Sequence, residues 1–135
     1  KIPAGGSRRP CASGMEIEET LMVISDGKAV FTEAVAMMAE TGRAALADAG
    51  IAVDDVTQWI PHQANCRIIE ATRKQIGIAP DKLASTVAEF ANSSAATIPL
   101  TWSKAAGGAG VAEGARILLS AAGAGLTGGS IVWGG

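Results

Sequence analysis

The sequence is poor in several kinds of residue, and each shortage excludes a class of function. Aromatic residues make up only 4% of the 135 residues, which argues against an aromatic-lined binding face. Basic residues do not outnumber acidic ones, and a net charge of -2 is unsuited to a surface that follows phosphates, so we expect no nucleic acid partner. Apolar runs are interrupted well short of the roughly 20 residues that a membrane span needs, so we expect no membrane partner.

Cysteine is also scarce, which limits covalent scaffolding. Cys11 and Cys66 can form at most one bridge, so a disulfide scaffold is not expected and a reducing cytoplasm is the predicted location. The N-terminal residues lack the apolar core of a secretory signal, and the sequence does not begin with methionine. We interpret residues 1–16, which are rich in glycine, proline and arginine, as a loop that enters from a missing N-terminal half.

What the sequence does contain is a regular alternation of strand-like and helix-like segments. Apolar and β-branched runs predict five strands, at residues 17–24, 56–60, 83–88, 115–121 and 130–133. Helical spacing of apolar residues predicts three helices, at residues 28–49, 64–76 and 94–106. Gly50 is expected to end the first helix, and Pro99 must lie in the first turn of the third helix or bend it.

The order of these elements predicts the fold class. The order βαβαβαββ is typical of an α/β domain, here over residues 17–135, in which helices cover a five-stranded mixed sheet. Helical crossovers imply parallel strands, whereas the short glycine-rich link at residues 123–129 implies that the last two strands form an antiparallel hairpin.

The single histidine and one asparagine occupy equivalent places in this layout. His62 follows the second predicted strand, and Asn92 follows the third. Loops after parallel strands emerge at the same sheet edge, so the imidazole and the carboxamide could converge on one carbonyl oxygen. Gly123, Ala124 and Gly125 follow the fourth strand and could add backbone N–H groups, because glycine permits a close approach. Together they predict a site that stabilises negative charge on a carbonyl oxygen.

Each of these residues also has a purely structural interpretation. A histidine after a strand is often only a hydrogen-bonded structural residue, and an asparagine before small residues is often a helix N-cap. The joint placement of both beside a glycine loop favours the catalytic interpretation without excluding the structural one.

Neither cysteine is expected to act as a nucleophile for this site. An activated cysteine of such a fold lies at a strand-to-helix elbow, where the helix dipole favours the thiolate. Cys11 is instead followed by a predicted strand that begins with three carboxylates. Cys66 lies in the helix after His62 and is expected to be a buried, small hydrophobic residue.

Two segments carry a family resemblance. Residues 59–69 (WIPHQANCRII) and 92–100 (NSSAATIPL) closely resemble the His and Asn motifs of β-ketoacyl-acyl-carrier-protein synthase III, a condensing enzyme of the thiolase superfamily. The similarity runs from about residue 17 to the end and corresponds to the C-terminal half of a protein built from two similar halves. The resemblance therefore implies half of a condensing enzyme of fatty acid biosynthesis, an acyltransferase whose nucleophilic cysteine lies in the other half.

The resemblance also implies a reaction, a decarboxylative Claisen condensation. In this family a cysteine accepts an acyl group from a coenzyme A thioester, and the His and Asn side chains hold the thioester oxygen of malonyl-carrier protein while CO₂ leaves. By resemblance, His62 and Asn92 are those donors, and both should be neutral. The backbone N–H of Ala124, between Gly123 and Gly125, would serve a second oxyanion hole for the acyl-cysteine carbonyl.

Partners follow from the same resemblance. Arg67, extended by Arg73 and Lys74, would dock an acidic acyl-carrier protein, although ordinary ion pairing with Glu70 is the alternative for this face. The other implied partners are the N-terminal half that bears the cysteine, a coenzyme A thioester, and a second copy of the complete enzyme in a homodimer. No metal and no cofactor is expected, since the substrates are carried as coenzyme A and acyl-carrier-protein thioesters.

Other functions remain open, and the sequence departs from the family in two places. The same fold could transfer an acyl group to a hydroxyl or amine with His62 as general base, or it could be a non-catalytic subunit that docks the carrier protein. Ala91 and Ser93 stand where the family usually has Gly and Thr, a change expected to restrict the backbone beside Asn92 only slightly. Residues 126–129 replace a segment that usually carries aromatics, which could alter the acyl channel.

Overall fold

The computed structural model describes residues 4, 7–20, 26–108 and 110–134. The chain forms two compact units, residues 1–30 and residues 31–135. In the first unit, a turn at Gly14 leads to the short helix α1, Ile17–Thr20. The strand predicted at residues 17–24 is therefore wrong for residues 17–20, and its remainder lies outside the described residues. Ile17 is 71% exposed, so the apolar pattern of this segment does not reflect a buried strand.

The long helix α2 spans Gly27–Asp48 and confirms the first predicted helix. Asp26 caps its start, where Oδ1 accepts a hydrogen bond from the Ala29 N–H at 2.9 Å. Gly50 ends it in the left-handed conformation, with φ of 65°, while the Ile51 N–H donates to the Leu46 carbonyl at 2.9 Å. The predicted glycine stop is thus a C-terminal motif that satisfies carbonyl groups left open by the helix end.

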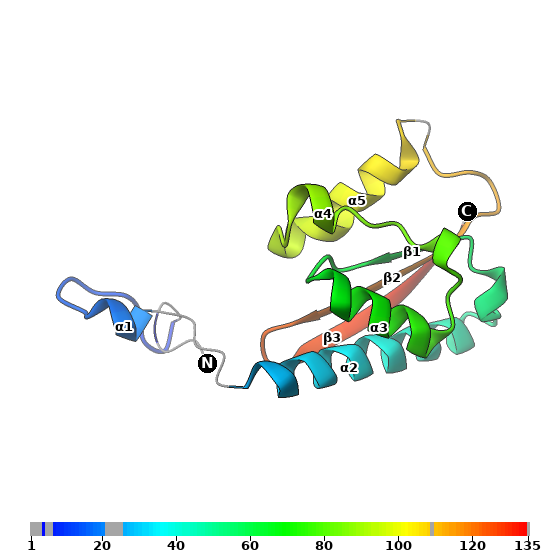
Figure 1. Cartoon of the computed structure of the whole chain (residues 1–135). Helices are drawn as coiled ribbons and strands as arrows, with labels where there is room; N and C mark the ends of the chain where they lie inside the picture. Colours follow the sequence, from blue (N-terminus) through cyan, green and yellow to red (C-terminus); the bar gives the residue numbers. More distant parts are fainter. Residues whose placement is uncertain (1–3, 5–6, 21–25, 109, 135) are drawn as a thin grey trace. The chain divides into compact units, whose positions relative to one another are not determined.

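A three-stranded mixed sheet forms the centre of the second unit. Its strands are β1, Gln58–Pro61, β2, Arg116–Gly123, and β3, Thr127–Gly134, in the order β1-β2-β3. β1 runs parallel to β2, and β2 and β3 form an antiparallel hairpin (Figure 1). The parallel pairing and the final hairpin are confirmed, whereas the prediction of five strands is not.

The segment predicted as the third strand, residues 83–88, adopts a different structure. Leu83 makes a single parallel bridge to Trp59, and the short helix α4, Val87–Phe90, begins soon after. The physical reason is a competing acceptor: the Gln63 side chain accepts hydrogen bonds from the backbone N–H groups of Thr86 and Val87. These two N–H groups are then not available to a neighbouring strand.

The remaining helices confirm the other two helical predictions with shifted starts. The helix α3 spans Cys66–Ile76 after its N-cap Asn65, whose Oδ1 accepts a hydrogen bond from Ile68 N–H at 2.9 Å. The predicted helix at 94–106 is a 3₁₀ turn, η3, Ser94–Ala96, followed by α5, Thr97–Ala106. Pro99 lies in the first turn of α5. Backbone N–H groups of the first turn have no intrahelical acceptor, so the N–H that proline lacks costs no hydrogen bond. Two further 3₁₀ turns are η1, Val53–Asp55, and η2, Pro80–Lys82.

Helices cover both faces of the sheet, which confirms the α/β class. α2 and α3 lie on one face, and α4 and α5 lie on the other (Figure 1). Because side chains alternate along a strand, Trp59 and Leu118 belong to the first core, and Ile60 and Ile117 belong to the second. No described helix is both long enough and apolar enough to span a membrane.

A chain of hydroxyl groups crosses the first core. The Trp59 indole N–H donates to the Ser120 Oγ at 3.2 Å, and Ser120 pairs with Ser130 at 3.0 Å. Ser130 in turn lies 2.9 Å from the Thr41 Oγ1 on α2. These bonds satisfy the polar groups that the tight packing of α2 on the sheet would otherwise bury without partners.

Candidate active site

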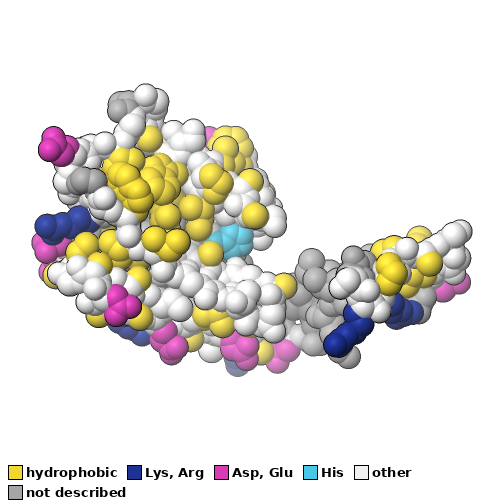
Figure 2. Space-filling model, turned by 180° about the vertical axis from the view of Figure 1, so that it is seen from behind, with side chains coloured by type: hydrophobic (Ala, Val, Ile, Leu, Met, Phe, Trp, Pro, Cys, Tyr) yellow, Lys and Arg dark blue, Asp and Glu magenta, His cyan; other side chains and the backbone are white. Residues whose placement is uncertain are grey.

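A pocket of about 390 Å³ opens at the carboxyl ends of β1 and β2. It is lined by His62, Ser94, Ala95, Ala121, Ala122, Gly123, Thr127, Gly128 and Gly129. The loop after β1, the segment of the Asn motif and the hairpin of β2 and β3 therefore meet at one hollow. Figure 2 shows the imidazole at the surface, at the margin of an indentation.

His62 is held on both its backbone and its side chain. Its backbone N–H donates to the Ser120 carbonyl at 2.7 Å, which continues the pairing of β1 with β2 by one residue. Its ring Nδ1 lies 2.6 Å from the Thr97 Oγ1 on α5. Desolvation by partial burial lowers the pKa of His62 below its ordinary value of 6.5, so the ring is neutral at pH 7. A neutral imidazole carries one N–H and can donate one hydrogen bond.

Asn92 is exposed, and its side chain is engaged with its own backbone segment. Its Oδ1 accepts a hydrogen bond from the Ser94 N–H at 3.0 Å, an Asx turn and not the helix N-cap of the structural interpretation. This contact uses the carbonyl oxygen and leaves the amide NH₂ without a hydrogen-bond partner among the described residues. Ser94 and Ala95 line the pocket with His62, but Asn92 does not, and among the described residues no hydrogen bond joins its side chain to His62. The convergence of these two donors on one oxygen stays a prediction.

Ala91, just before Asn92, has an unusual backbone conformation. Its φ of 51° and ψ of -157° lie in a region that glycine adopts readily and that a side chain makes strained, at about 1–3 kcal/mol. The expectation that alanine restricts this position only slightly is therefore wrong. The Cβ atom meets its own backbone in this conformation, so the usual glycine of the family would be free of the strain.

The glycine loop is shorter than the sequence predicts. Gly123 ends β2 and lines the pocket, whereas Ala124 and Gly125 lie in the exposed hairpin turn outside the pocket lining. β3 already begins at Thr127. A Cβ atom on Gly128 would lie 2.8 Å from the Ala121 carbonyl oxygen of the paired strand β2, so a side chain here would displace backbone atoms. The proposed donor role of the Ala124 N–H stays a prediction.

Gln63 is a central residue that the sequence reasoning did not single out. Its side chain is fully buried, and its Nε2 donates to the Pro61 carbonyl at 2.7 Å. Its Oε1 accepts from the Ser85 hydroxyl at 3.1 Å and from the Thr86 and Val87 N–H groups at 2.9 and 3.1 Å. It thereby fastens the His62 loop to the start of α4, the helix that leads to Asn92. Its only signal in the sequence is its position beside the histidine.

The basic residues of α3 differ in how freely they present their charge. Arg73 binds the Glu70 carboxylate through two nitrogens, at 2.8 and 2.7 Å, and its side chain is only 12% exposed. Lys74 lies 3.5 Å from Glu70 and remains 69% exposed. The hydrogen bond from Arg73 lowers the pKa of Glu70 to about 2. Arg67 does not pair with Glu70 and instead lies 5.9 Å from the centre of the Phe31 ring.

Both cysteines are exposed, and neither lines the pocket around His62. The predicted burial of Cys66 is wrong. Cys66 is the first residue of α3, whose buried stripe comprises Ile68, Ile69, Thr72 and Ile76. Residue 66 lies about 100° around the helix from the centre of that stripe, so its thiol faces away from the core.

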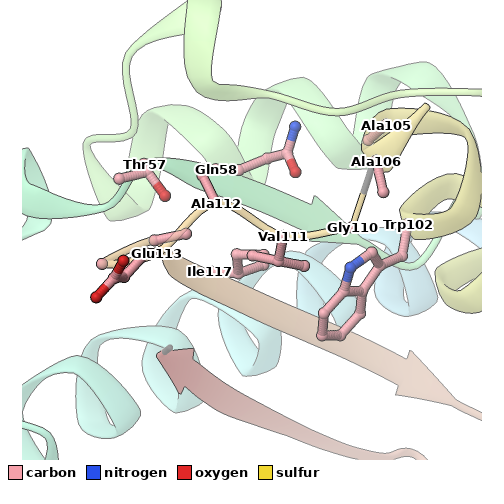
Figure 3. A pocket seen from close by; sticks show the side chains of 12 residues that line it. Thr57, Gln58, Trp102, Ala105, Ala106, Gly110, Val111, Ala112, Glu113 and Ile117 are labelled. Atoms are coloured by element: carbon pink, nitrogen blue, oxygen red, sulfur yellow. The ribbon is translucent and has the colours of Figure 1, made fainter. Parts of the chain in front are cut away.

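A second pocket, of about 370 Å³, lies at the opposite ends of β1 and β2. Its lining includes Gln58 of β1, Ile117 of β2 and Trp102 of α5, and it contains none of the predicted site residues. Figure 3 shows Trp102 at one end of this pocket and Glu113 at the other. Of the predicted site residues, His62 and Gly123 line the pocket at the carboxyl ends of β1 and β2, as residues that follow or end parallel strands should. Asn92 follows the helix α4 and not a strand.

Comparison with known proteins identifies similar chains. The family described as 3-oxoacyl-[acyl-carrier-protein] synthase III C terminal matches residues 46–134. A relative from Brucella abortus, named 3-oxopimeloyl-[acyl-carrier-protein] synthase, is 46% identical over 98% of this chain and 40% of its own length. A relative from Rhodobacter capsulatus, named beta-ketoacyl-[acyl-carrier-protein] synthase III, is 46% identical over 78% of this chain and 33% of its own length.

Solved structures show the same fold. The 3-oxoacyl-[acyl-carrier-protein] synthase III of Aquifex aeolicus matches with a TM-score of 0.79 and 35% identity, over 84% of this chain and 36% of that one. The corresponding synthase of Pseudomonas aeruginosa matches with a TM-score of 0.75 and 37% identity, over 82% of this chain and 34% of that one. The chain thus spans well under half the length of the proteins it resembles.

Proposed function

This chain belongs to the family of 3-oxoacyl-[acyl-carrier-protein] synthase III C-terminal domains, and from this membership we propose that it forms the carbanion-stabilising part of a condensing enzyme. The complete protein would join an acyl thioester to malonyl-acyl-carrier protein with loss of CO₂. The observation that carries the proposal is the neutral, half-buried His62 in a pocket that three separate segments line. Such a pocket can place donors around a single oxygen atom.

The chemistry requires a donor where negative charge develops. When the malonyl C–C bond breaks, its electron pair moves toward the thioester carbonyl, and the oxygen becomes an enolate while CO₂ leaves. His62 and the NH₂ of Asn92 would donate hydrogen bonds to that oxygen. Both donors are neutral, so they stabilise the enolate without protonating it, and the carbanion stays reactive.

The covalent step needs groups that we place outside this pocket. The carbanion would attack an acyl-cysteine carbonyl, form the new C–C bond and expel the thiolate. Because neither Cys11 nor Cys66 lines the pocket, we place this cysteine in the N-terminal half of the complete protein. The backbone N–H of Ala124, on the loop from Gly123 to Gly125, would stabilise the oxyanion of that second step.

Acyl-carrier protein would dock on α3, beside the pocket loop. Arg67 and Lys74 are exposed and keep their charges available to an acidic partner, whereas Arg73 is largely committed to Glu70. We therefore assign the docking contacts chiefly to Arg67 and Lys74. Long-range attraction of this kind raises the rate of association and weakens with salt.

The names of two relatives indicate a candidate for the acyl group that the complete protein would extend. A 3-oxopimeloyl group is a seven-carbon chain that ends in a carboxylate, so a condensation that adds two carbons from malonyl needs a five-carbon donor with a terminal carboxylate. The relative from Brucella abortus bears that name, and we propose glutaryl thioester as the donor to compare with an uncharged acetyl thioester. A preference for glutaryl would place the chain with the 3-oxopimeloyl synthases.

The test is to separate decarboxylation from acyl transfer in the complete protein. His62→Ala and Asn92→Ala should each lower CO₂ release from malonyl-carrier protein by about 100-fold, the typical effect of losing one oxyanion donor. Mass spectrometry should still find the acyl group on the protein, because that step does not use the malonyl oxygen. The matched control is Asn65→Asp, which keeps a side-chain acceptor for the Ile68 N–H and leaves the pocket lining intact.

Three results would overturn the proposal. Unchanged CO₂ release in both variants would show that the pair does not stabilise the enolate. Acyl transfer to an amine or hydroxyl acceptor without any CO₂ release by the wild type would instead indicate simple acyl transfer. Carrier binding without either reaction would indicate a docking subunit.

A further inference from the structure

The contact between His62 and Thr97 is the tightest side-chain link of the proposed site. Thr97 is the first residue of α5 and is 2% exposed, and its Oγ1 lies 2.6 Å from the His62 Nδ1. Thr97 does not itself line the pocket, whereas His62 does. The ring thus turns its Nδ1 toward the buried hydroxyl, and Nε2 is the nitrogen left for the pocket.

The direction of this hydrogen bond follows from what the hydroxyl can reach. Among the described residues, the His62 Nδ1 is the only hydrogen-bond partner of the Thr97 Oγ1. If Nδ1–H donated to the oxygen, the hydroxyl proton would be buried without an acceptor, which proteins rarely tolerate. If the hydroxyl donates, its proton is satisfied and only a lone pair stays unused, which is less costly. The second arrangement is therefore the favoured one.

We propose that Thr97 is a positioning residue that donates its hydroxyl proton to the His62 Nδ1 and so keeps the ring proton on Nε2, directed to the pocket. This inference rests on the proposed condensation. It states which nitrogen of His62 donates the hydrogen bond that the enolate oxygen accepts. Partial burial also lowers the pKa of His62, which favours the neutral ring that such a bond requires.

The position of the proton separates the two chemistries that the fold could perform. With the proton on Nε2, His62 donates to an enolate oxygen, as condensation needs. With the proton on Nδ1, Nε2 would offer a lone pair, which repels an enolate oxygen and suits a general base for acyl transfer to an alcohol or amine. Thr97 therefore biases the site toward condensation.

The first experiment reads the tautomer in the unsubstituted protein and does not depend on activity. In the complete protein labelled with ¹⁵N-histidine, the imidazole ¹⁵N shifts at pH 7.5 should show a protonated Nε2 and an unprotonated Nδ1. His62→Gln identifies the signal by its loss. A protonated Nδ1 in the wild type would overturn the inference even if CO₂ release is normal, whereas absent CO₂ release with a protonated Nε2 would overturn only the proposed function.

The second experiment removes the hydroxyl. Thr97→Val keeps the shape of the side chain and should lower CO₂ release at least tenfold while acylation of the protein is preserved, and the ¹⁵N shifts should move toward a mixture of tautomers. Thr97→Ser restores a hydroxyl and should recover both readouts. Unchanged shifts and unchanged CO₂ release in a folded Thr97→Val protein would contradict the assignment.

The same helix offers a matched control. Thr101, one turn further along α5, is equally buried, and its hydroxyl pairs with the Thr86 hydroxyl at 2.6 Å. Thr101→Val removes a buried hydroxyl of the same kind without touching His62. Thr101→Val should leave the imidazole ¹⁵N shifts unchanged and the rate of CO₂ release within twofold of the wild type. A loss of CO₂ release equal to that in Thr97→Val would indicate a merely structural effect.

Discussion

The two proposed donors, His62 and Asn92, are held in opposite ways. His62 is half-buried and is bound through its backbone to Ser120 and through its ring to Thr97. Asn92 is exposed, and within the described part of the chain its side chain makes one hydrogen bond, accepted from the Ser94 N–H two residues away. The core of the chain fixes the imidazole, whereas a local turn fixes the carboxamide.

The difference indicates how the site is completed. Oxyanion donors act best when they are oriented before the reaction, because no reorganisation is then needed as charge develops. The His62 side meets this condition in the chain as it stands. We expect the Asn92 side to tighten only when the thioester is bound, as catalytic hydrogen bonds often do.

The largest effect on stability should come from removing the hydrogen bonds that Gln63 makes beside His62. Gln63→Met removes the acceptor of the buried Thr86 N–H and of the partly buried Val87 N–H and should lower the free energy of unfolding by about 2–3 kcal/mol, because a buried donor without a partner costs about 1–3 kcal/mol. Urea unfolding of the complete protein measures this loss. The same substitution at the exposed Gln75 of α3 should change stability by less than about 0.5 kcal/mol.

A small loss in Gln63→Met would contradict the role given to this side chain. It would show that water or a shifted α4 satisfies the two N–H groups at little cost. CO₂ release in the variant sharpens the comparison: it should fall even where the protein stays folded, because the His62 loop loses its link to the segment before Asn92.

The opposite sign is expected on the asparagine side. Ala91→Gly removes the Cβ atom from a residue with φ of 51° and should raise the free energy of unfolding by about 1 kcal/mol. The matched control is Ala88→Gly in α4, where helical backbone makes glycine unfavourable, so it should lower stability by about 1 kcal/mol. Equal effects at the two positions would mean that Ala91 is not strained.

Strong local signals predicted most of the fold. Helical spacing and capping located α2 and α3 within two residues, and the glycine-rich link located the β2–β3 hairpin. Residues 83–88 were mispredicted because their composition favours a strand, while the Gln63 side chain, some twenty residues earlier, takes up the N–H groups a strand would use. That competition is a tertiary contact, and no local pattern reveals it.

The candidate site could be predicted in part, because the topology of the sheet follows from local signals. Topology alone brings His62, Gly123 and the segment after Asn92 to one sheet edge, and the pocket confirms this for His62 and Gly123. Thr97 could not be found in this way, because its contact with His62 depends on how α5 packs against β1. Cys66 shows the converse error, since residue type predicted burial but its place on α3 decided exposure.

The smallest expected effect is a change of stability with pH. It distinguishes His62 from Asn92, because only His62 titrates. Burial depresses the pKa of His62 in the folded protein below 6.5, so between the folded and unfolded pKa values the unfolded chain binds more protons. The stability that His62 contributes is therefore present above pH 6.5 and is lost as the pH falls through the folded pKa. The wild type should lose stability relative to His62→Gln between pH 7.5 and 5, whereas Asn92→Ala should keep a constant difference from the wild type. Urea unfolding at several pH values measures both series. An unshifted pKa for the His62 ring would contradict the desolvation that partial burial imposes on this side chain.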